Sequence, residues 1–167
     1  MKISELLLTE LEEEIKLTRR VLERVPVDKP DFVPHAKSMP MGRLAFLVAS
    51  FGAFGESVLT TSEFDLSKAS LKPAPLQSAK ELVKMFEDGV AKVRTALAKT
   101  ADEKWDEPWK LIMGGKSLFE GSRFLAYREM FLNHIVHHRA QLGIYLRMNG
   151  HKVPAIYGPS ADESQIS

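Results

Sequence analysis

Three histidines lie within five residues of the stretch FLNHIVHHRAQLGIYLRMNGHK, which runs from Phe131 to Lys152. His134 and His138 are four residues apart, and side chains at this spacing lie on the same face of an α-helix. Two imidazoles in this arrangement can direct their nitrogens at one metal ion. His137 is rotated from His138 by about 100° around a helix, so we interpret it as a residue on the flank of the site.

The face that holds His134 and His138 also carries Phe131, Ile135 and Leu142, so it is the apolar face of the predicted helix. Burial of two imidazoles costs free energy unless each finds a polar partner. Two interpretations remain open: a metal or polar site, and a pair of core histidines that each bond to a neighbour. The HExxH pattern of zinc proteases is excluded, because Ile135 stands where that pattern requires a glutamate.

Composition limits the classes of protein to which the chain can belong. It has 167 residues, of which 44% are hydrophobic and 27% charged, so we expect one soluble domain over residues 1–167. The net charge of +1 predicts no nucleic-acid partner and no membrane partner. The chain has no cysteine, so a metal would have to be held by His, Asp, Glu, water or backbone oxygen. We recognise no signal peptide and no membrane span in the sequence, and we expect the protein in the cytoplasm.

Apolar residues at helical spacing predict the elements that must position the histidines. Four long helices are expected, over residues 3–25, 41–60, 76–99 and 122–149. Pro26 and Pro30 end the first helix, Ser78 is a candidate N-cap for the third, and Gly150 is a suitable C-terminal stop for the fourth. The expected fold is therefore all-α, an antiparallel four-helix bundle over the whole chain.

The connections between these helices are predicted as loops. Residues 61–75 are long enough to form a crossover rather than a tight turn. Residues 100–118 are also assigned to a loop, with a turn at Gly114–Gly115. Trp105 and Trp109 lie in this second connection, and we expect them to cover one end of the core.

The run NHIVHHRAQLGIYLRMNGHKVPAIYGPSADE resembles the end of the last long helix and the tail of DinB-like proteins, a family of metal-binding four-helix bundles. The most specific part of the resemblance is H-x-x-x-H-R-x-Q-L, here His134, His138, Arg139, Gln141 and Leu142. The segment HAKSMPMGRLA, which leads into the second predicted helix, strengthens it. The resemblance covers most of the chain in helix order.

This resemblance implies a divalent metal, nickel or zinc, held by three histidines. Two of the three match His134 and His138, and the third would come from the second helix, where this chain has Leu47. Glu56 is too far along that helix to replace it, and the neutral hydroxyl of Ser50 is a weak ligand. We therefore expect a metal to be bound weakly or not at all.

Two functions are compatible with these residues. The resemblance implies a metal-dependent transferase or hydrolase, of the thiol-transferase type, with an incomplete histidine site and no assigned catalytic residue. The alternative is a non-catalytic helical bundle that binds a small-molecule ligand or acts as a dimer, with Phe46, Leu47, Phe51 and Phe54 filling the former metal cavity. A homodimer is expected from the apolar surface of the second predicted helix and from the resemblance. Arg139 either points to solvent or pairs with a carboxylate, or it anchors an anion at the mouth of the pocket.

Overall fold

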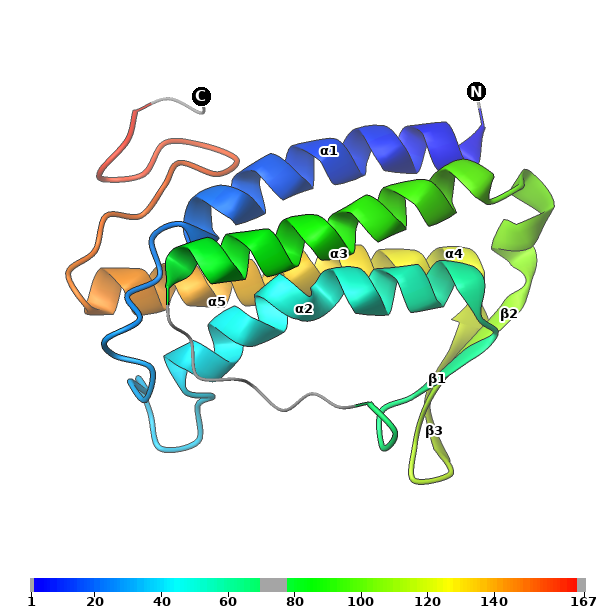
Figure 1. The fold of residues 1–167 in the computed structure, drawn as a ribbon, viewed down its shortest axis with the longest axis horizontal. Helices are drawn as coiled ribbons and strands as arrows, with labels where there is room; N and C mark the ends of the chain where they lie inside the picture. Colours follow the sequence, from blue (N-terminus) through cyan, green and yellow to red (C-terminus); the bar gives the residue numbers. More distant parts are fainter. Residues whose placement is uncertain (1, 70–77, 165–167) are drawn as a thin grey trace.

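The computed structural model describes residues 2–69 and 78–164 (Figure 1). Its long helices are α1 (Ile3–Leu22), α2 (Met41–Thr60), α3 (Ala79–Lys99) and α5 (Asn133–Met148). A short helix α4 (Arg123–Leu125) and a π-helix η2 (Ala126–Leu132) lead directly into α5. Residues 123–148 are therefore one continuous helical segment, close to the fourth helix predicted from the sequence.

Most of the predicted helix ends agree with the structure. The Ser78 hydroxyl accepts a hydrogen bond from the Glu81 N–H at 3.3 Å, which confirms the N-cap of α3. The predicted start of that helix at Leu76 lies outside the described residues. Gly150 has φ of +76°, the left-handed conformation typical of a helix stop. α1 ends at Leu22, one turn earlier than predicted.

The prediction of a loop over residues 100–118 was wrong, because part of this segment forms a sheet. β2 (Pro108–Met113) pairs antiparallel with β3 (Lys116–Ser122) and parallel with β1 (Glu63–Asp65), which gives the order β1-β2-β3 in the described residues. Gly114 and Gly115, with φ of +56° and +78°, form the predicted turn between β2 and β3. The fold is mostly helical with a small sheet rather than all-α.

The helix directions also differ from a simple antiparallel bundle. In Figure 1, α1 and α5 run in one direction, and α2 and α3 run together in the opposite direction. The end of α2 and the start of α3 therefore lie at opposite ends of the bundle, so the connection between them is a crossover, as predicted. Gly52 and Gly89 allow the parallel pair to approach closely, since a Cβ on Gly52 would lie 2.4 Å from the Gly89 carbonyl carbon.

α2 is the central element of the core. Its buried residues include Leu44, Val48 and Val58, each with no exposed surface. Among the described residues it is also the one helix long and apolar enough to cross a membrane, but half of that window is buried inside the bundle. Such burial is typical of the core helix of a folded domain.

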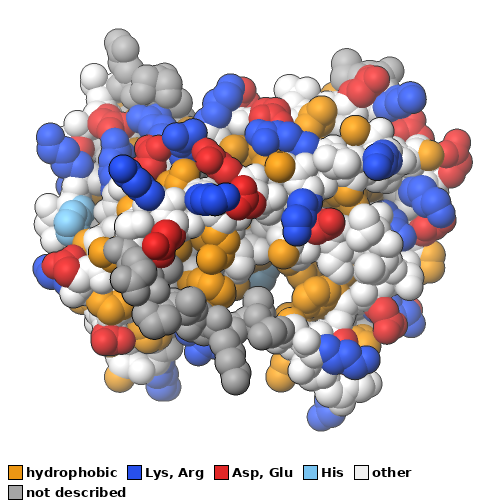
Figure 2. All heavy atoms as spheres, viewed as in Figure 1, with side chains coloured by type: hydrophobic (Ala, Val, Ile, Leu, Met, Phe, Trp, Pro, Cys, Tyr) orange, Lys and Arg blue, Asp and Glu red, His pale blue; other side chains and the backbone are white. Residues whose placement is uncertain are grey.

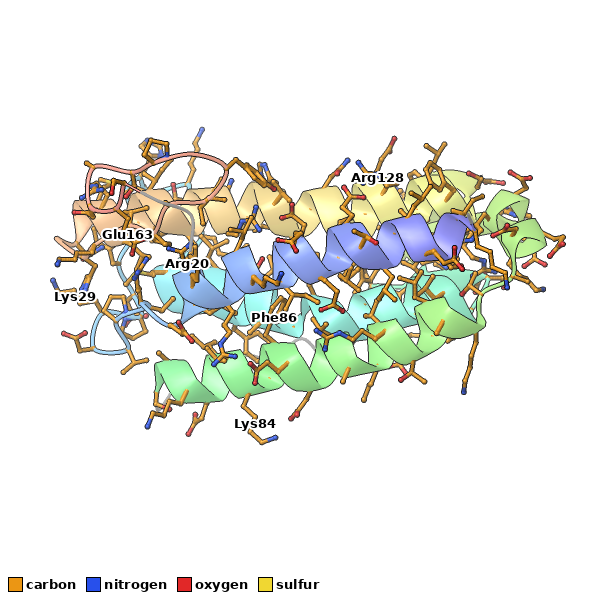
Figure 3. All side chains as sticks on the ribbon, turned by 90° about the horizontal axis from the view of Figure 1, so that it is seen from above. Arg20, Lys29, Lys84, Phe86, Arg128 and Glu163 are labelled. Atoms are coloured by element: carbon orange, nitrogen blue, oxygen red, sulfur yellow. The ribbon has the colours of Figure 1, made fainter. Side chains whose placement is uncertain are left out.

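The outer surface and the tail complete the bundle. Figure 2 shows basic and acidic side chains interspersed over the face formed by α1 and α3. Glu163 in the C-terminal tail forms an ion pair with Arg20 of α1 (Figure 3) and another with Arg24, just after that helix. Trp105 and Trp109 are buried at the end of the bundle that carries the sheet, as the sequence predicted.

Candidate functional site: a histidine pair beside an apolar cavity

His134 and His138 lie one turn apart at the start of α5, directly after the π-helix. Their rings stack on each other, with centroids 4.7 Å apart and planes inclined by 27°. The ring of Phe51, from α2, packs against both, with centroid distances of 5.0 Å to His134 and 5.9 Å to His138. Both imidazoles are half-buried between α5 and α2, whereas His137 is exposed on the flank.

Hydrogen bonds fix which ring nitrogen of each histidine carries the proton. His134 Nδ1 lies 3.3 Å from the Met130 carbonyl oxygen, which can only accept, so Nδ1 is the donor. His138 Nδ1 lies 2.8 Å from the side-chain oxygen of Gln141, and the amide nitrogen of Gln141 lies 3.0 Å from His137 Nε2. The Nε2 atoms of His134 and His138 are therefore left as electron-pair donors.

The surroundings of the pair favour uncharged imidazoles. Burial is the main cause that lowers the pKa of His134 below its ordinary value, and the neighbouring His138 adds to the effect. Burial also lowers the pKa of His138, partly opposed by the hydrogen bond to Gln141. Both rings are thus kept in the form that can accept a hydrogen bond or coordinate a metal.

The donor set is too small for the three-histidine metal site that the resemblance implies. Leu47 and His134 line the same cavity, so a leucine stands on the α2 side where a third nitrogen was sought. Within residues 2–69 and 78–164, no three His, Asp or Glu side chains are grouped so that they could hold an ion together. The arrangement offers two nitrogen ligands with correctly oriented Nδ1–H groups, and an apolar wall opposite them.

That apolar wall belongs to a cavity of about 300 Å³ between α2, the sheet and η2. Nine of the described residues that line it are apolar, and Ser50 and His134 are polar. The apolar lining residues are Phe46, Leu47, Phe51, Ala53, Phe54, Phe64, Leu66, Leu111 and Met130. An apolar cavity with a few convergent polar groups is the usual form of a small-molecule site.

Sequence reasoning missed the part of this cavity that the sheet provides. Phe64 in β1, Leu66 just after it and Leu111 in β2 form one wall, and Phe54 packs edge-on against Phe64 at 5.1 Å. These residues lie in the segments that were predicted as loops. The signal that could have found them is the alternation Trp109–Lys110–Leu111 shortly before two glycines, which is a hairpin pattern.

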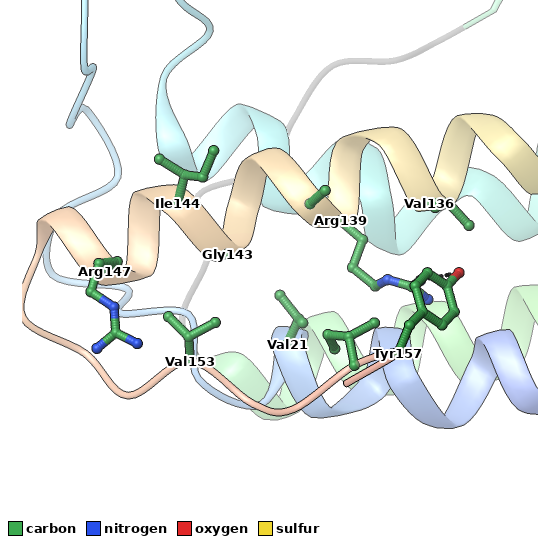
Figure 4. Close-up of a pocket in the computed structure, with 10 residues that line it drawn as sticks. Val21, Val136, Arg139, Gly143, Ile144, Arg147, Val153 and Tyr157 are labelled. Atoms are coloured by element: carbon green, nitrogen blue, oxygen red, sulfur yellow. Dashed lines mark hydrogen bonds between the residues drawn. The ribbon is translucent and has the colours of Figure 1, made fainter. Parts of the chain in front are cut away.

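Arg139 lies on the opposite side of α5 from the histidines. Its guanidinium donates to the Glu14 carboxylate at 2.6 Å, to the Thr18 hydroxyl at 3.1 Å and to the Tyr157 hydroxyl at 2.7 Å. Figure 4 shows Arg139 reaching toward Tyr157 of the tail across a groove that also contains Arg147. Arg139 is 2% exposed, so pairing with a carboxylate is confirmed, and its alternative interpretation as an anion anchor beside the histidines was wrong.

Comparisons with known proteins agree with this arrangement of helices. The family model described as "DinB family" matches residues 1–167. A DinB-like protein from Bacillus cereus is similar in structure, with a TM-score of 0.65, 18% identity and coverage of 90% of this chain and 95% of that chain. A DinB-like protein (YjoA) from Bacillus subtilis has a TM-score of 0.62, 17% identity and coverage of 92% and 94%.

None of the curated proteins with which the sequence was compared matches it. The two structural neighbours support the fold alone, because their identities are low. The family model spans every residue and includes the helix with the histidine pair, and this chain belongs to the DinB family.

Proposed function

We propose that the protein binds a small, predominantly apolar molecule in the cavity between α2, the sheet and η2. The observation that carries this proposal is the lining: nine apolar residues line a space of about 300 Å³, and His134 and Ser50 are its polar residues. Four of the nine are phenylalanines, Phe46, Phe51, Phe54 and Phe64, so a flat aromatic ligand suits the space.

The expected affinity follows from the size of such a ligand. A one-ring aromatic compound gains its binding free energy mainly from removal of apolar surface from water, at about 25 cal/mol per Å². Part of this gain is lost to the entropy of association. We therefore expect dissociation constants of about 0.1–1 mM for simple one-ring probes, which correspond to roughly −4 to −5.5 kcal/mol.

The test is titration calorimetry with p-cresol and p-xylene against the full chain. At least one of them is expected to bind, and Leu47→Trp, which fills the cavity, is expected to abolish binding. Leu118→Trp is the matched control, because Leu118 is 56% exposed on β3 and does not line the cavity. If neither compound binds, or if Leu47→Trp binds as well as the unmodified chain, the proposal is wrong.

A second function, weak binding of a divalent metal, is favoured by the histidine tautomers. His134 and His138 both hold Nδ1–H against an oxygen, which leaves Nε2 as the ligand atom in each. Two imidazoles bind nickel or zinc more weakly than three and fix the geometry poorly. A reaction is not assigned to this site, since its donor set does not complete a catalytic centre.

Two further properties stay predictions, namely a cytoplasmic location and a homodimer. Exposed apolar side chains on α5, Ile144 at 60% and Met148 at 54%, support a self-association surface. Light scattering of the purified chain tests the dimer, and fractionation of expressing cells tests the location.

A further inference from the structure

The polar groups that line the cavity offer hydrogen-bond acceptors to a ligand and no donors. Ser50 Oγ donates its proton to the Leu47 carbonyl oxygen at 3.0 Å. This hydroxyl has a single proton, so what remains available to a ligand is a pair of acceptor sites. Ser50 therefore contributes an acceptor to the cavity and no donor.

The other hydrogen-bonding atoms that the lining offers to a ligand are also acceptors. His134 gives its Nδ1 proton to the Met130 carbonyl oxygen, so Nε2 of the neutral ring is an acceptor. The thioether of Met130, which also lines the cavity, can only accept a weak hydrogen bond. Three side-chain atoms of the described lining stay available to a ligand: Ser50 Oγ, His134 Nε2 and the sulfur of the otherwise apolar Met130. All three are acceptors, although they come from α2, α5 and η2.

Charge adds a second restriction. Of the described residues that line the cavity, none is Asp, Glu, Lys or Arg. A ligand carboxylate would meet acceptors and no cation, and a ligand ammonium would be buried without a counter-charge. Either would lose its hydration without compensation.

We propose that the cavity selects uncharged aromatic molecules that carry a hydrogen-bond donor, such as a phenol hydroxyl or an indole N–H. This inference rests on the proposed function and names the ligand class of the same site. The donor of the ligand satisfies Ser50 Oγ or His134 Nε2, and its ring packs among the phenylalanines. A ligand of the same shape without a donor leaves these acceptors unpaired when it displaces water from them.

The experiment compares p-cresol, p-xylene and 4-methylbenzoate by titration calorimetry at pH 8, on the full chain. The first two differ by one hydroxyl in place of a methyl group, so they have nearly the same shape. p-Cresol is expected to bind about five- to tenfold more tightly than p-xylene, and 4-methylbenzoate more weakly than either. In a cavity that only removes apolar surface, the order of the first two would be reversed, since a hydroxyl is costlier to take out of water.

Variants assign the preference to particular atoms. Ser50→Ala combined with His134→Leu removes both strong acceptors and is expected to bring p-xylene level with p-cresol or ahead of it. Leu111→Val, the matched control, changes the apolar lining and is expected to change the affinity for both compounds by the same factor.

The outcomes separate this inference from the proposed function. If p-xylene binds the unmodified chain as tightly as p-cresol, and Leu47→Trp blocks both, the cavity function stands and the donor preference is wrong. A preference for p-cresol that survives the double variant shows that Ser50 and His134 are not the acceptors, which also overturns the inference. If no compound binds, the proposed function fails together with it.

Discussion

The two sides of α5 differ in how far their polar side chains find hydrogen-bond partners within the protein. On the side that faces α1 and the tail, Arg139 is matched by a carboxylate, a hydroxyl and a phenol, and the network extends to a bond from the Tyr157 hydroxyl to Glu14. On the side that faces α2, His134 and His138 use only their Nδ1 atoms within the described part of the chain.

The difference separates a structural polar cluster from the surface that we propose as a binding site. The Arg139 cluster has its charges and donors satisfied internally, so it adds stability and orientation to the tail without offering atoms to a ligand. On the histidine side, no residue among 2–69 and 78–164 donates to Nε2 of either ring, and this arrangement is compatible with the proposed ligand site. The same helix thus positions the tail with one face and carries the proposed site on the other.

The largest effect, on the stability of the protein, is expected from removing Arg139 from its cluster. Arg139→Leu removes the cation from the Glu14 carboxylate, whose side chain is 12% exposed, and an unpaired charge at this depth is strongly unfavourable. We expect the free energy of unfolding to fall by about 3–5 kcal/mol. Urea denaturation measures it.

A matched control and a double variant sharpen that prediction. Lys84→Met removes an exposed ion pair with Asp88 and is expected to leave stability unchanged. Arg139→Leu combined with Glu14→Leu is expected to recover much of the loss, because no uncompensated charge remains. If Arg139→Leu alone lowers the free energy of unfolding no more than Lys84→Met does, the Arg139 cluster is not a stabilising polar cluster.

A smaller effect, on metal affinity, is expected from adding a third histidine on the side of α5 that carries His134 and His138. Leu47→His adds an imidazole on the α2 wall opposite His134, and we expect nickel or zinc to bind about tenfold more tightly or better than in the unmodified chain. Calorimetry on tag-free protein measures it, and His138→Ala in the same background is expected to cancel the gain. A folded Leu47→His variant with no gain would show that Leu47 does not stand at the missing corner.

The smallest effect is expected in the pH dependence of stability. Burial lowers the pKa of His134 and His138 in the folded state, so the unfolded chain binds more protons once the pH falls below the ordinary value of about 6.5. The contribution of the pair is therefore full above that pH, and stability declines as the pH falls from about 6.5 toward the lower folded-state pKa values. Denaturation at pH 8 and pH 5.5 tests this, and a His134→Leu/His138→Leu variant is expected to show a shallower decline. An unchanged decline would mean that other groups cause it.

The helices and the histidine face could be predicted from the sequence because both depend on local spacing. Apolar periodicity located the four helices, and the four-residue interval placed His134 and His138 on one face. The sheet was missed because its strands are short and lie in segments rich in polar residues. The cavity was missed with it, since Phe64, Leu66 and Leu111 meet α2 only through long-range packing.

The role of Arg139 shows another limit of sequence reasoning. A basic residue next to two histidines in the sequence is equally compatible with a site and with an ion pair. The decision depends on Glu14 and Tyr157, which lie 125 and 18 residues away along the chain and meet Arg139 only when α1 and the tail pack on α5.

The π-helix that precedes α5 determines which way each side chain of α5 points around the helix axis. In η2 the Asn133 N–H bonds to the Arg128 carbonyl, five residues back, so the turn holds one residue more than an α-helical turn would. Deleting one residue there, Glu129 for instance, would turn the rest of the helix by about 100° about its axis relative to the bundle. His134 would then leave the cavity wall, His138 would turn away from Phe51, and the Arg139 cluster would lose its partners. This one additional residue therefore sets the orientation of both faces of the helix.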